Sequence, residues 1–162
     1  MIYEITLSLQ DLFDHNYVHL DLKPENIIIE NLNPIKLKLI DLESCRKLNV
    51  FDNNIIAGTC GFVSPEVMLH HKYYYNSDIW SLGIIMYYLY TGFFVFPESN
   101  SLYINAITKF NTVNPSIKFL NKFIPESCFL LKQMLQPIYT YRISVKGILN
   151  SKFIKKFQKY HK

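Results

Sequence analysis

The sequence has 162 residues, 49% of them apolar, and a formal net charge of +4. This length matches a single domain with enough apolar residues to bury a core, which excludes a disordered chain, and the modest charge gives no reason to expect a nucleic-acid partner. The three cysteines are too widely spaced to indicate a disulfide framework or a zinc site, so a reducing compartment, cytoplasmic or nuclear, is expected.

The first part of the sequence predicts one helix and two short strands. Apolar residues recur at helical spacing over residues 2–15, which predicts an amphipathic helix. Two β-like runs follow at 26–29 and 35–40, separated by the turn-prone segment 30–34. Residues 41–62 show no sustained period and predict a long loop, and loops of that length inside a compact domain are usually functional.

Helices predominate in the rest of the sequence. Ser77 and Asp78 are typical of a helix start. The sequence contains no internal repeat, low-complexity tract or interdomain linker, so it predicts one mainly helical unit. Apolar spacing and the turn signals between the segments predict helices at residues 65–71, 78–90, 100–110, 126–136 and 144–157.

One segment allows two interpretations. Residues 79–96, IWSLGIIMYYLYTGFFVF, run for 18 residues without a charge, which meets the length criterion for a membrane span. Small and turn-forming residues such as Gly83 and Gly92 interrupt the run, as in a buried helix of a globular domain. At this point both the membrane span and the buried central helix remain open.

A charged segment lies between the first helix and the first β-like run. There His19, Asp21, Lys23 and Asn26 form the pattern H-x-D-x-K-x-x-N, and Asp41 follows at the end of the second β-like run. Phosphoryl transfer requires such groups, because a carboxylate orients and deprotonates a hydroxyl while amide and carboxylate oxygens hold a metal ion. A nearby ammonium group can neutralise charge on the transferred group.

Taken together, these motifs resemble those of the eukaryotic protein kinases, specifically the C-terminal lobe of a serine/threonine kinase. HLDLKPEN is similar to the catalytic loop, LIDLE to the metal-binding segment, GTCGFVSPE to the end of the activation segment, SDIWSLGII to the central helix, and YRISVKGILNSKFI to the end of the lobe. The five motifs occur in the family order over residues 2–157, which is far more specific than any single match. The run GTCGFVSPE followed by DIWSLGIIMYYLYTG most resembles calcium/calmodulin-dependent-type kinases.

The resemblance implies a fold as well as an activity. It implies a mainly α partial kinase domain over residues 2–157, with no second domain. In that fold a helical bundle surrounds a buried central helix, and a small β hairpin carries the catalytic and metal-binding loops. The apolar run would then be buried in protein, so no membrane partner is expected and a small membrane protein becomes a distant alternative.

The resemblance also assigns roles to single residues. Asp21 would be the catalytic base for a protein serine or threonine hydroxyl, and Lys23 would contact the transferred phosphate. Thr59 would hydrogen-bond near both, as a third catalytic residue. Asn26 and Asp41 would hold Mg²⁺. The set that binds the cofactor ATP would be Lys23, Glu25, Asn26 and Asp41.

Other matching residues are expected to build the fold. Glu66 would pair with Arg142 in the interior, and Asp78 would accept hydrogen bonds from the backbone of the catalytic loop. His19 is expected to be a buried hydrogen-bonding residue and not an acid or base, while Trp80 is expected to be a packing residue.

Three residues depart from the family pattern. Leu20 replaces the arginine that binds an activation-loop phosphate in many kinases, which argues against that mode of regulation. Leu42 replaces a phenylalanine and is expected to fill the same apolar space. Glu43 replaces a glycine, so we expect backbone strain there and an added negative charge beside a metal ligand.

The largest departure is an absence. The five glycines of the sequence form no G-x-G-x-x-G, and no N-terminal lobe is recognisable before residue 2. The 162 residues are therefore expected to be inactive in isolation and to expose apolar surface that another lobe or a kinase partner would cover. The alternative is a noncatalytic pseudokinase fragment that acts as a scaffold or competitor.

Overall fold

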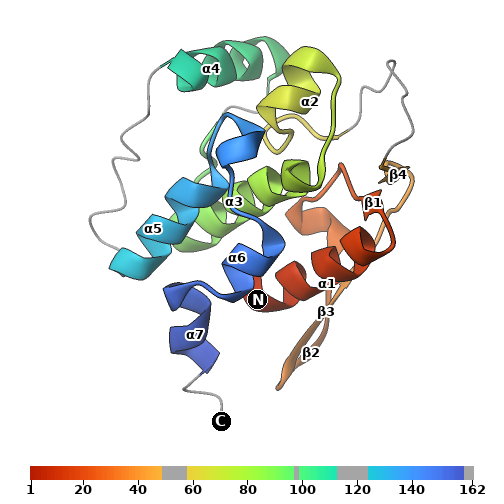
Figure 1. Cartoon of the computed structure of the whole chain (residues 1–162), viewed down its shortest axis with the longest axis vertical. Coiled ribbons are helices and arrows are strands. Elements are labelled where there is room, and N and C mark those ends of the chain that lie inside the picture. The colour runs from red at the N-terminus through yellow and green to blue at the C-terminus, as the bar shows by residue number, and fades with distance from the viewer. Residues whose placement is uncertain (49–57, 97–98, 113–123, 159–162) are drawn as a thin grey trace.

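The computed structural model describes residues 1–48, 58–96, 99–112 and 124–158. Helices surround one long central helix, and two small antiparallel sheets lie at one side of the molecule (Figure 1). The elements in chain order are α1 (Ile2–Asp14), β1 (Tyr17–Val18), η1 (Pro24–Asn26), β2 (Ile27–Leu32), β3 (Ile35–Leu39), β4 (Arg46–Lys47), α2 (Pro65–His70), α3 (Tyr75–Thr91), α4 (Asn100–Thr112), α5 (Pro125–Met134), η3 (Tyr139–Tyr141), α6 (Val145–Leu149) and α7 (Lys152–Gln158).

The central helix α3 runs through the core. Every residue from Ser77 to Tyr87 is buried, including Trp80, so this helix is apolar on all sides and packs against its neighbours on all sides. Within the described part of the chain, no helix is long and apolar enough to span a membrane. The run 79–96 does not continue as helix, because Gly92 ends α3 in a left-handed conformation with φ of 73°.

The predicted start of this helix was wrong. Ser77 and Asp78 were expected to cap it, yet α3 begins at Tyr75, one turn earlier. Ser77 accepts a hydrogen bond from the backbone amide of Tyr74, so it acts from inside the first turn, in the manner of a capping box. The Asp78 side chain does not cap the helix. It accepts hydrogen bonds from the loop after β1, as described below.

The C-terminal end of α5 approaches α3 closely at Gly83. A Cβ atom on this glycine would lie 2.8 Å from a methyl group of Leu135 and 3.1 Å from the Cβ of Met134, at the end of α5. Only a residue without a side chain allows the backbones to come so near. Gly83 therefore fixes the position of α5 against the central helix.

The first helix and the β hairpin are close to their predicted bounds. β2 pairs antiparallel with β3, with Ile27 opposite Leu39, and an irregularity between Ile29 and Asn31 shifts the register. α1 packs against β3. The predicted loop 41–62 contains one strand that the sequence did not reveal, because β4 pairs with β1, and residues 49–57 of that loop lie outside the described residues.

The C-terminal segment was predicted as one helix over 144–157, but it forms two. Asn150 ends α6, and Ser151 begins the next turn by accepting a hydrogen bond from the backbone amide of Ile154. Serine at such a position favours a helix start over helix continuation. The break turns α7 so that Phe153 and Ile154 are buried.

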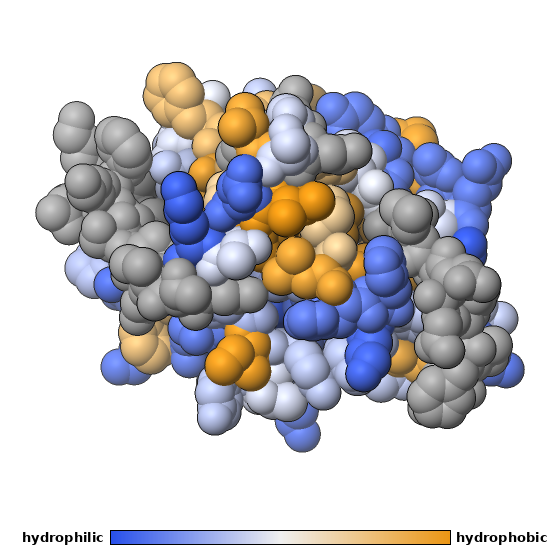
Figure 2. Space-filling view, turned by 90° about the horizontal axis from the view of Figure 1, so that it is seen from above, coloured by the Kyte–Doolittle hydropathy of each residue, from blue (hydrophilic) through white to orange (hydrophobic). Residues whose placement is uncertain are grey.

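α4 and α2 lie side by side at one end of the molecule. Figure 2 views this end and shows apolar side chains gathered near the centre, with hydrophilic side chains around them. On α4 itself, Leu102 and Ile104 are exposed whereas Tyr103 and Ile107 are fully buried. α4 thus anchors to the core through one face and presents apolar side chains on the other.

Candidate active site

The loop after β1 is held by the central helix. The backbone amides of His19 and Leu20 donate hydrogen bonds to the two carboxylate oxygens of Asp78, at 2.7 and 2.9 Å. Complete burial raises the pKa of the Asp78 carboxyl, against the effect of the two amide donors. The prediction that Asp78 accepts from this loop is confirmed, and it explains why Leu20 tolerates a left-handed φ of 65°.

His19 connects the loop to the end of the β hairpin. Its Nε2 lies 3.1 Å from the carbonyl oxygen of Ile40, and its Nδ1 accepts a hydrogen bond from the backbone amide of Asp21 at 3.3 Å. Since a carbonyl can only accept, Nε2 carries the proton and the ring is neutral in this arrangement. The side chain is fully buried, as expected for a residue that holds the backbone in place.

The Asp21 carboxylate is the centre of the site. Thr59 donates to its Oδ1 at 2.6 Å, and Lys23 and Asn26 donate to its Oδ2 at 2.9 and 3.2 Å. Lys23 also donates to the Thr59 hydroxyl at 2.7 Å, which closes a ring of three polar groups. The structure thus brings together residues from two segments that are 38 positions apart in the sequence.

These neighbours determine the charge of Asp21. Partial burial alone would raise the pKa of the carboxyl, but hydrogen bonds from Lys23 and Thr59 and the positive charge of Lys23 outweigh that effect. The pKa of Asp21 therefore lies below its ordinary value, and the group is ionised at neutral pH. An ionised carboxylate in a hydrogen-bonded cluster can accept a proton or hold a hydroxyl in position.

Asn26 and Asp41 are brought together by the hairpin. The Ile40 backbone amide donates to the carbonyl of Asn26 at 3.0 Å, so Asp41, the next residue, lies close to Asn26 in the chain fold. Asp41 is exposed and adopts a left-handed φ of 60°, a conformation that aspartate tolerates better than most residues.

Asn26 and Asp41 supply the oxygen atoms that a magnesium ion requires. Both hydrogen bonds of the Asn26 side chain use its Nδ2, which leaves the amide oxygen available as a ligand. An amide oxygen and an exposed carboxylate are the kinds of ligand that suit Mg²⁺, which prefers oxygen ligands and keeps several waters. The donor set therefore fits the metal that the sequence predicted.

Two predicted features of this region differ in the structure. Glu43 was expected to strain the backbone, but among the described residues the non-glycine positive φ angles fall at Asn16, Leu20, Asp41 and His71. Leu42 was expected to fill an apolar space, yet its side chain is 54% exposed.

Glu25, the remaining predicted site residue, is not part of the Asp21 cluster. It lies in η1 with its side chain exposed, and this side chain makes no hydrogen bond to the described residues.

Leu42 lies at the edge of an open cavity of about 330 Å³ between α1 and β3. The cavity is lined by Ser8, Asp11, Leu12, His15, Leu37, Lys38, Leu39 and Leu42.

A buried ion pair joins α2 to the segment that follows η3. Arg142 donates to both carboxylate oxygens of Glu66, at 2.8 and 2.9 Å, as the sequence predicted. Arg142 also donates to the backbone carbonyl of Asn76, and its guanidinium lies 5.2 Å from the ring centroid of Trp80. The contacts with Asn76 and Trp80 were not predicted, since no sequence pattern distinguishes a stacked tryptophan from one that only packs.

Comparison with known proteins agrees with this arrangement. The family model for the protein kinase domain matches residues 1–154. The maternal embryonic leucine zipper kinase of Danio rerio is 32% identical over 157 residues, which cover 93% of this chain and 22% of that protein. The chain thus spans less than a quarter of the length of this relative.

Proposed function

The chain belongs to the protein kinase family, and on that premise we propose that residues 2–157 form the C-terminal lobe of a serine/threonine protein kinase. The reaction would transfer the terminal phosphoryl group of ATP to a serine or threonine hydroxyl of a protein. The observation that carries the proposal is the ring of hydrogen bonds among Asp21, Lys23 and Thr59. Decay of the site would not be expected to preserve all three contacts.

Asp21 is proposed as the catalytic base. Its lowered pKa keeps it ionised at neutral pH, ready to orient the substrate hydroxyl and accept its proton. The Thr59 hydroxyl donates a hydrogen bond to Oδ1 of Asp21 in this structure. A substrate hydroxyl would bind the same oxygen beside Thr59 or in its place. Because Thr59 is itself a hydroxyl donor at 2.6 Å, its position marks where a substrate serine or threonine would bind.

Lys23 has two roles in this proposal. Its ammonium holds the Asp21 carboxylate at 2.9 Å in the absence of substrate, and it can turn to a transferred phosphate when one is present. The side chain is only 21% exposed, so its charge is partly protected from solvent screening.

Asn26 and Asp41 would hold Mg²⁺, and Lys23, Glu25, Asn26 and Asp41 would contact ATP. The cation supplies charge neutralisation on the phosphate oxygens when it is bound. The protein's own contribution is the hairpin, which holds the backbone of Asn26 beside that of Ile40, the residue before Asp41.

We further propose that these residues work together with an N-terminal lobe supplied by another segment or chain. The sequence contains no G-x-G-x-x-G to cover the phosphates. Since phosphoryl transfer depends mainly on positioning and electrostatics, the 162 residues alone would give no measurable turnover. Serine/threonine specificity, a calcium/calmodulin-dependent-type subfamily and an intracellular location belong to the same proposal.

The test is a phosphorylation assay of the protein recovered by a tag from its own cells, so that every segment encoded with these residues is retained. With Mg²⁺ and labelled ATP, we expect phosphoserine and phosphothreonine in added protein substrates. Asp21→Asn should lower the rate by about 10²- to 10⁴-fold.

The matched control for that assay is Asp14→Asn, which makes the same chemical change at an exposed position of α1. It should leave the rate unchanged. An Asp21→Asn protein as active as the wild type, or phosphotyrosine as the main product, would refute the proposal.

A further inference from the structure

Charge is divided unequally along the sequence. Residues 1–98 contain six basic and twelve acidic residues, whereas residues 99–162 contain eleven basic residues and a single acid, Glu126. A modest net charge of +4 therefore conceals an acidic and a strongly basic part. Such asymmetry is a reason to look for a charged partner on the basic part.

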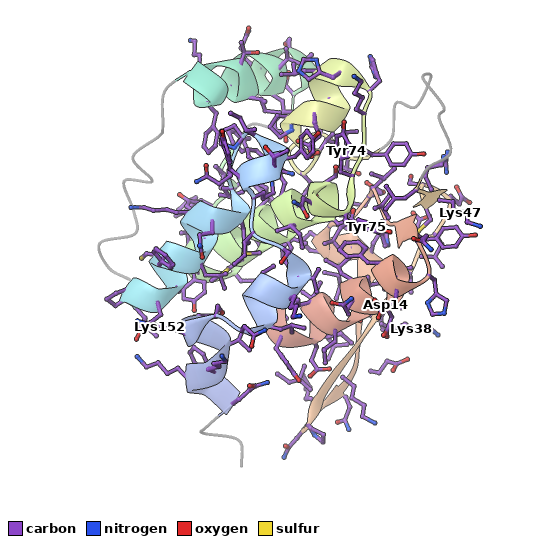
Figure 3. All side chains as sticks on the ribbon, in the orientation of Figure 1. Asp14, Lys38, Lys47, Tyr74, Tyr75 and Lys152 are labelled. Carbon is purple, nitrogen blue, oxygen red and sulfur yellow. The ribbon has the colours of Figure 1, made fainter. Side chains whose placement is uncertain are left out.

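Four of these eleven basic residues lie on α5 and α7. Lys132 lies on the exposed side of α5, and Lys152 and Lys155 lie on the exposed side of α7, which packs against α5. Figure 3 shows Lys152 at the outer edge of the molecule, on the opposite side from the labelled Lys38 and Lys47. We call Lys132, Lys152, Lys155 and Lys156 the α5–α7 basic surface.

An exposed aromatic side chain lies within this surface. Phe129 is 66% exposed and precedes Lys132 by one turn of α5. Lys156 reaches from α7 to Glu126, one turn before Phe129, at 3.2 Å. This ion pair joins the two helices, so on α5 Phe129 lies between Lys132 and the residue that binds Lys156.

The details of this surface distinguish between classes of acidic partner. A helix that binds a lipid surface inserts its apolar face, but on α7 that face is used by the core, since Phe153 and Ile154 are 6% and 3% exposed. Recognition of nucleic-acid phosphates favours the arginine fork, and the single arginine of residues 99–162 is Arg142, which is buried against Glu66. Exposed lysines together with one exposed phenylalanine on two packed helices fit the carboxylates and an apolar side chain of a protein segment.

We propose that the α5–α7 basic surface docks an acidic protein segment that contains a large apolar residue, and that substrates of the kinase carry such a segment away from the phosphorylated residue. The second part of this proposal rests on the proposed function. Docking here does not cover the Asp21 site, because β1 and the loop after it lie on the other side of α3 (Figure 1). A remote contact of this kind raises the local concentration of the substrate hydroxyl.

Binding is tested without ATP, so the outcome does not depend on catalysis. The probe is a short fluorescein-labelled peptide of glutamate and aspartate with one central leucine, titrated with the 162-residue chain by fluorescence anisotropy. Replacement of Lys132, Lys152 and Lys155 by glutamate should weaken binding about ten-fold or more. Phe129→Ser should weaken it about five-fold, through loss of apolar contact.

A charge-matched variant serves as the control, with glutamate in place of the exposed Lys36, Lys38 and Lys47. It has the same net charge but should keep binding within about two-fold of the wild type. Equal loss in both triple variants would overturn the proposal, because it would show attraction by net charge alone. Asp21→Asn should bind as the wild type does, which separates docking from catalysis.

Two further probes distinguish the source of the acidic groups. Phosphatidylserine-containing vesicles and single-stranded RNA are tested under the same conditions and with the same variants. The acidic-segment proposal requires that the peptide binds more tightly per charge than either probe. Stronger binding of vesicles or RNA that is lost in the Lys132, Lys152 and Lys155 variant would assign the surface to a lipid or nucleic-acid partner instead.

Discussion

Gly58 is the residue on which the position of Thr59 depends. It adopts a φ of 101°, and a Cβ atom there would lie 2.6 Å from the carbonyl oxygen of Leu20 and 2.7 Å from a methyl group of Val63. Glycine alone allows this close approach of two backbone segments. The Thr59 hydroxyl therefore reaches Asp21 because its neighbour has no side chain.

The first prediction concerns Gly58→Ala. We expect the rate of phosphorylation by the protein from its own cells to fall about 10-fold or more, because Thr59 and Leu20 must move apart. The measurement is kcat and KM with one protein substrate. Gly92→Ala is the control, since it has a comparable φ of 73° but no atom within 4 Å of the added Cβ.

The control should lose about 1 kcal/mol of stability and keep its kcat. Equal losses of kcat in both variants would mean that strain in general, and not the contact with Leu20, lowers activity.

At the level of single residues, the sequence predicted which polar side chains lie together around Asp21. The spacing of Asp21, Lys23 and Asn26 places them in one short loop, so any compact fold keeps them close. Thr59 could be predicted only through the family resemblance, because its contact is 38 positions away. Glu43 was wrongly expected to be strained, since the left-handed backbone occurs two residues earlier, at Asp41.

At the scale of elements, Glu66 and Arg142 join α2, α3 and η3. Burial by itself would raise the pKa of Glu66, but the hydrogen bonds and charge of Arg142 lower it below the ordinary value of 4.5. A lowered pKa means that protonation breaks a favourable interaction. The pair therefore contributes its full stability above about pH 4.5 and loses it as the pH falls further.

The second prediction follows from this dependence. Glu66→Gln should lower the free energy of unfolding by about 3–5 kcal/mol at pH 7, because it leaves the buried Arg142 charge without its partner. The difference from the wild type should shrink as the pH falls below 4.5, because Glu66 of the unfolded wild type takes up a proton there that the folded state binds only at lower pH. Urea unfolding at a series of pH values measures both effects.

Glu126→Gln provides the comparison, since Glu126 also forms an ion pair, with Lys156, but at a partly exposed position. Its unfolding should follow the wild type at each pH. A Glu66→Gln deficit that stays constant down to pH 3 would show that side-chain shape and not charge gives the effect.

The elements themselves were predicted from period and turn signals, and errors arose where tertiary contacts decide. The start of α3 depends on Tyr74 and Ser77, which bond to each other, while Asp78 is drawn away by the loop after β1. β1 and β4 have only two residues each, which is too short for a strand pattern, so their pairing could not be predicted from the sequence. The break at Ser151 carries a capping signal, but the apolar spacing on both sides masked it.

At the scale of the whole molecule, the β hairpin exposes much apolar surface. Ile28 and Ile29 are 45% and 44% exposed, and Leu32 is 75% exposed. Figure 1 shows β2 and β3 extending away from the helices. The sequence suggested that apolar surface would be uncovered, and we propose that the N-terminal lobe or a kinase partner covers it.

The third prediction is that this surface limits the solubility of the isolated chain. Ile29→Lys combined with Leu32→Lys should raise the soluble concentration severalfold and leave the melting temperature within about 2 °C, because neither side chain belongs to the core. Light scattering and thermal unfolding check the two parts. Leu102→Lys, an equally polar change at an exposed position of α4, should have a smaller effect.

A clear fall in melting temperature in the hairpin variant would mean that these residues stabilise the chain by themselves. In that case, no covering lobe would be needed to explain their apolar character.

The pairing of Glu66 with Arg142 also bears on the order in which the chain folds. These residues lie 76 positions apart, and closing so long a loop costs more entropy than forming the local turns of α3. The ion pair is therefore expected to form late, after the central helices have met. An interaction that forms late lowers the unfolding rate and hardly changes the folding rate. This pair is therefore expected to give the folded chain kinetic stability.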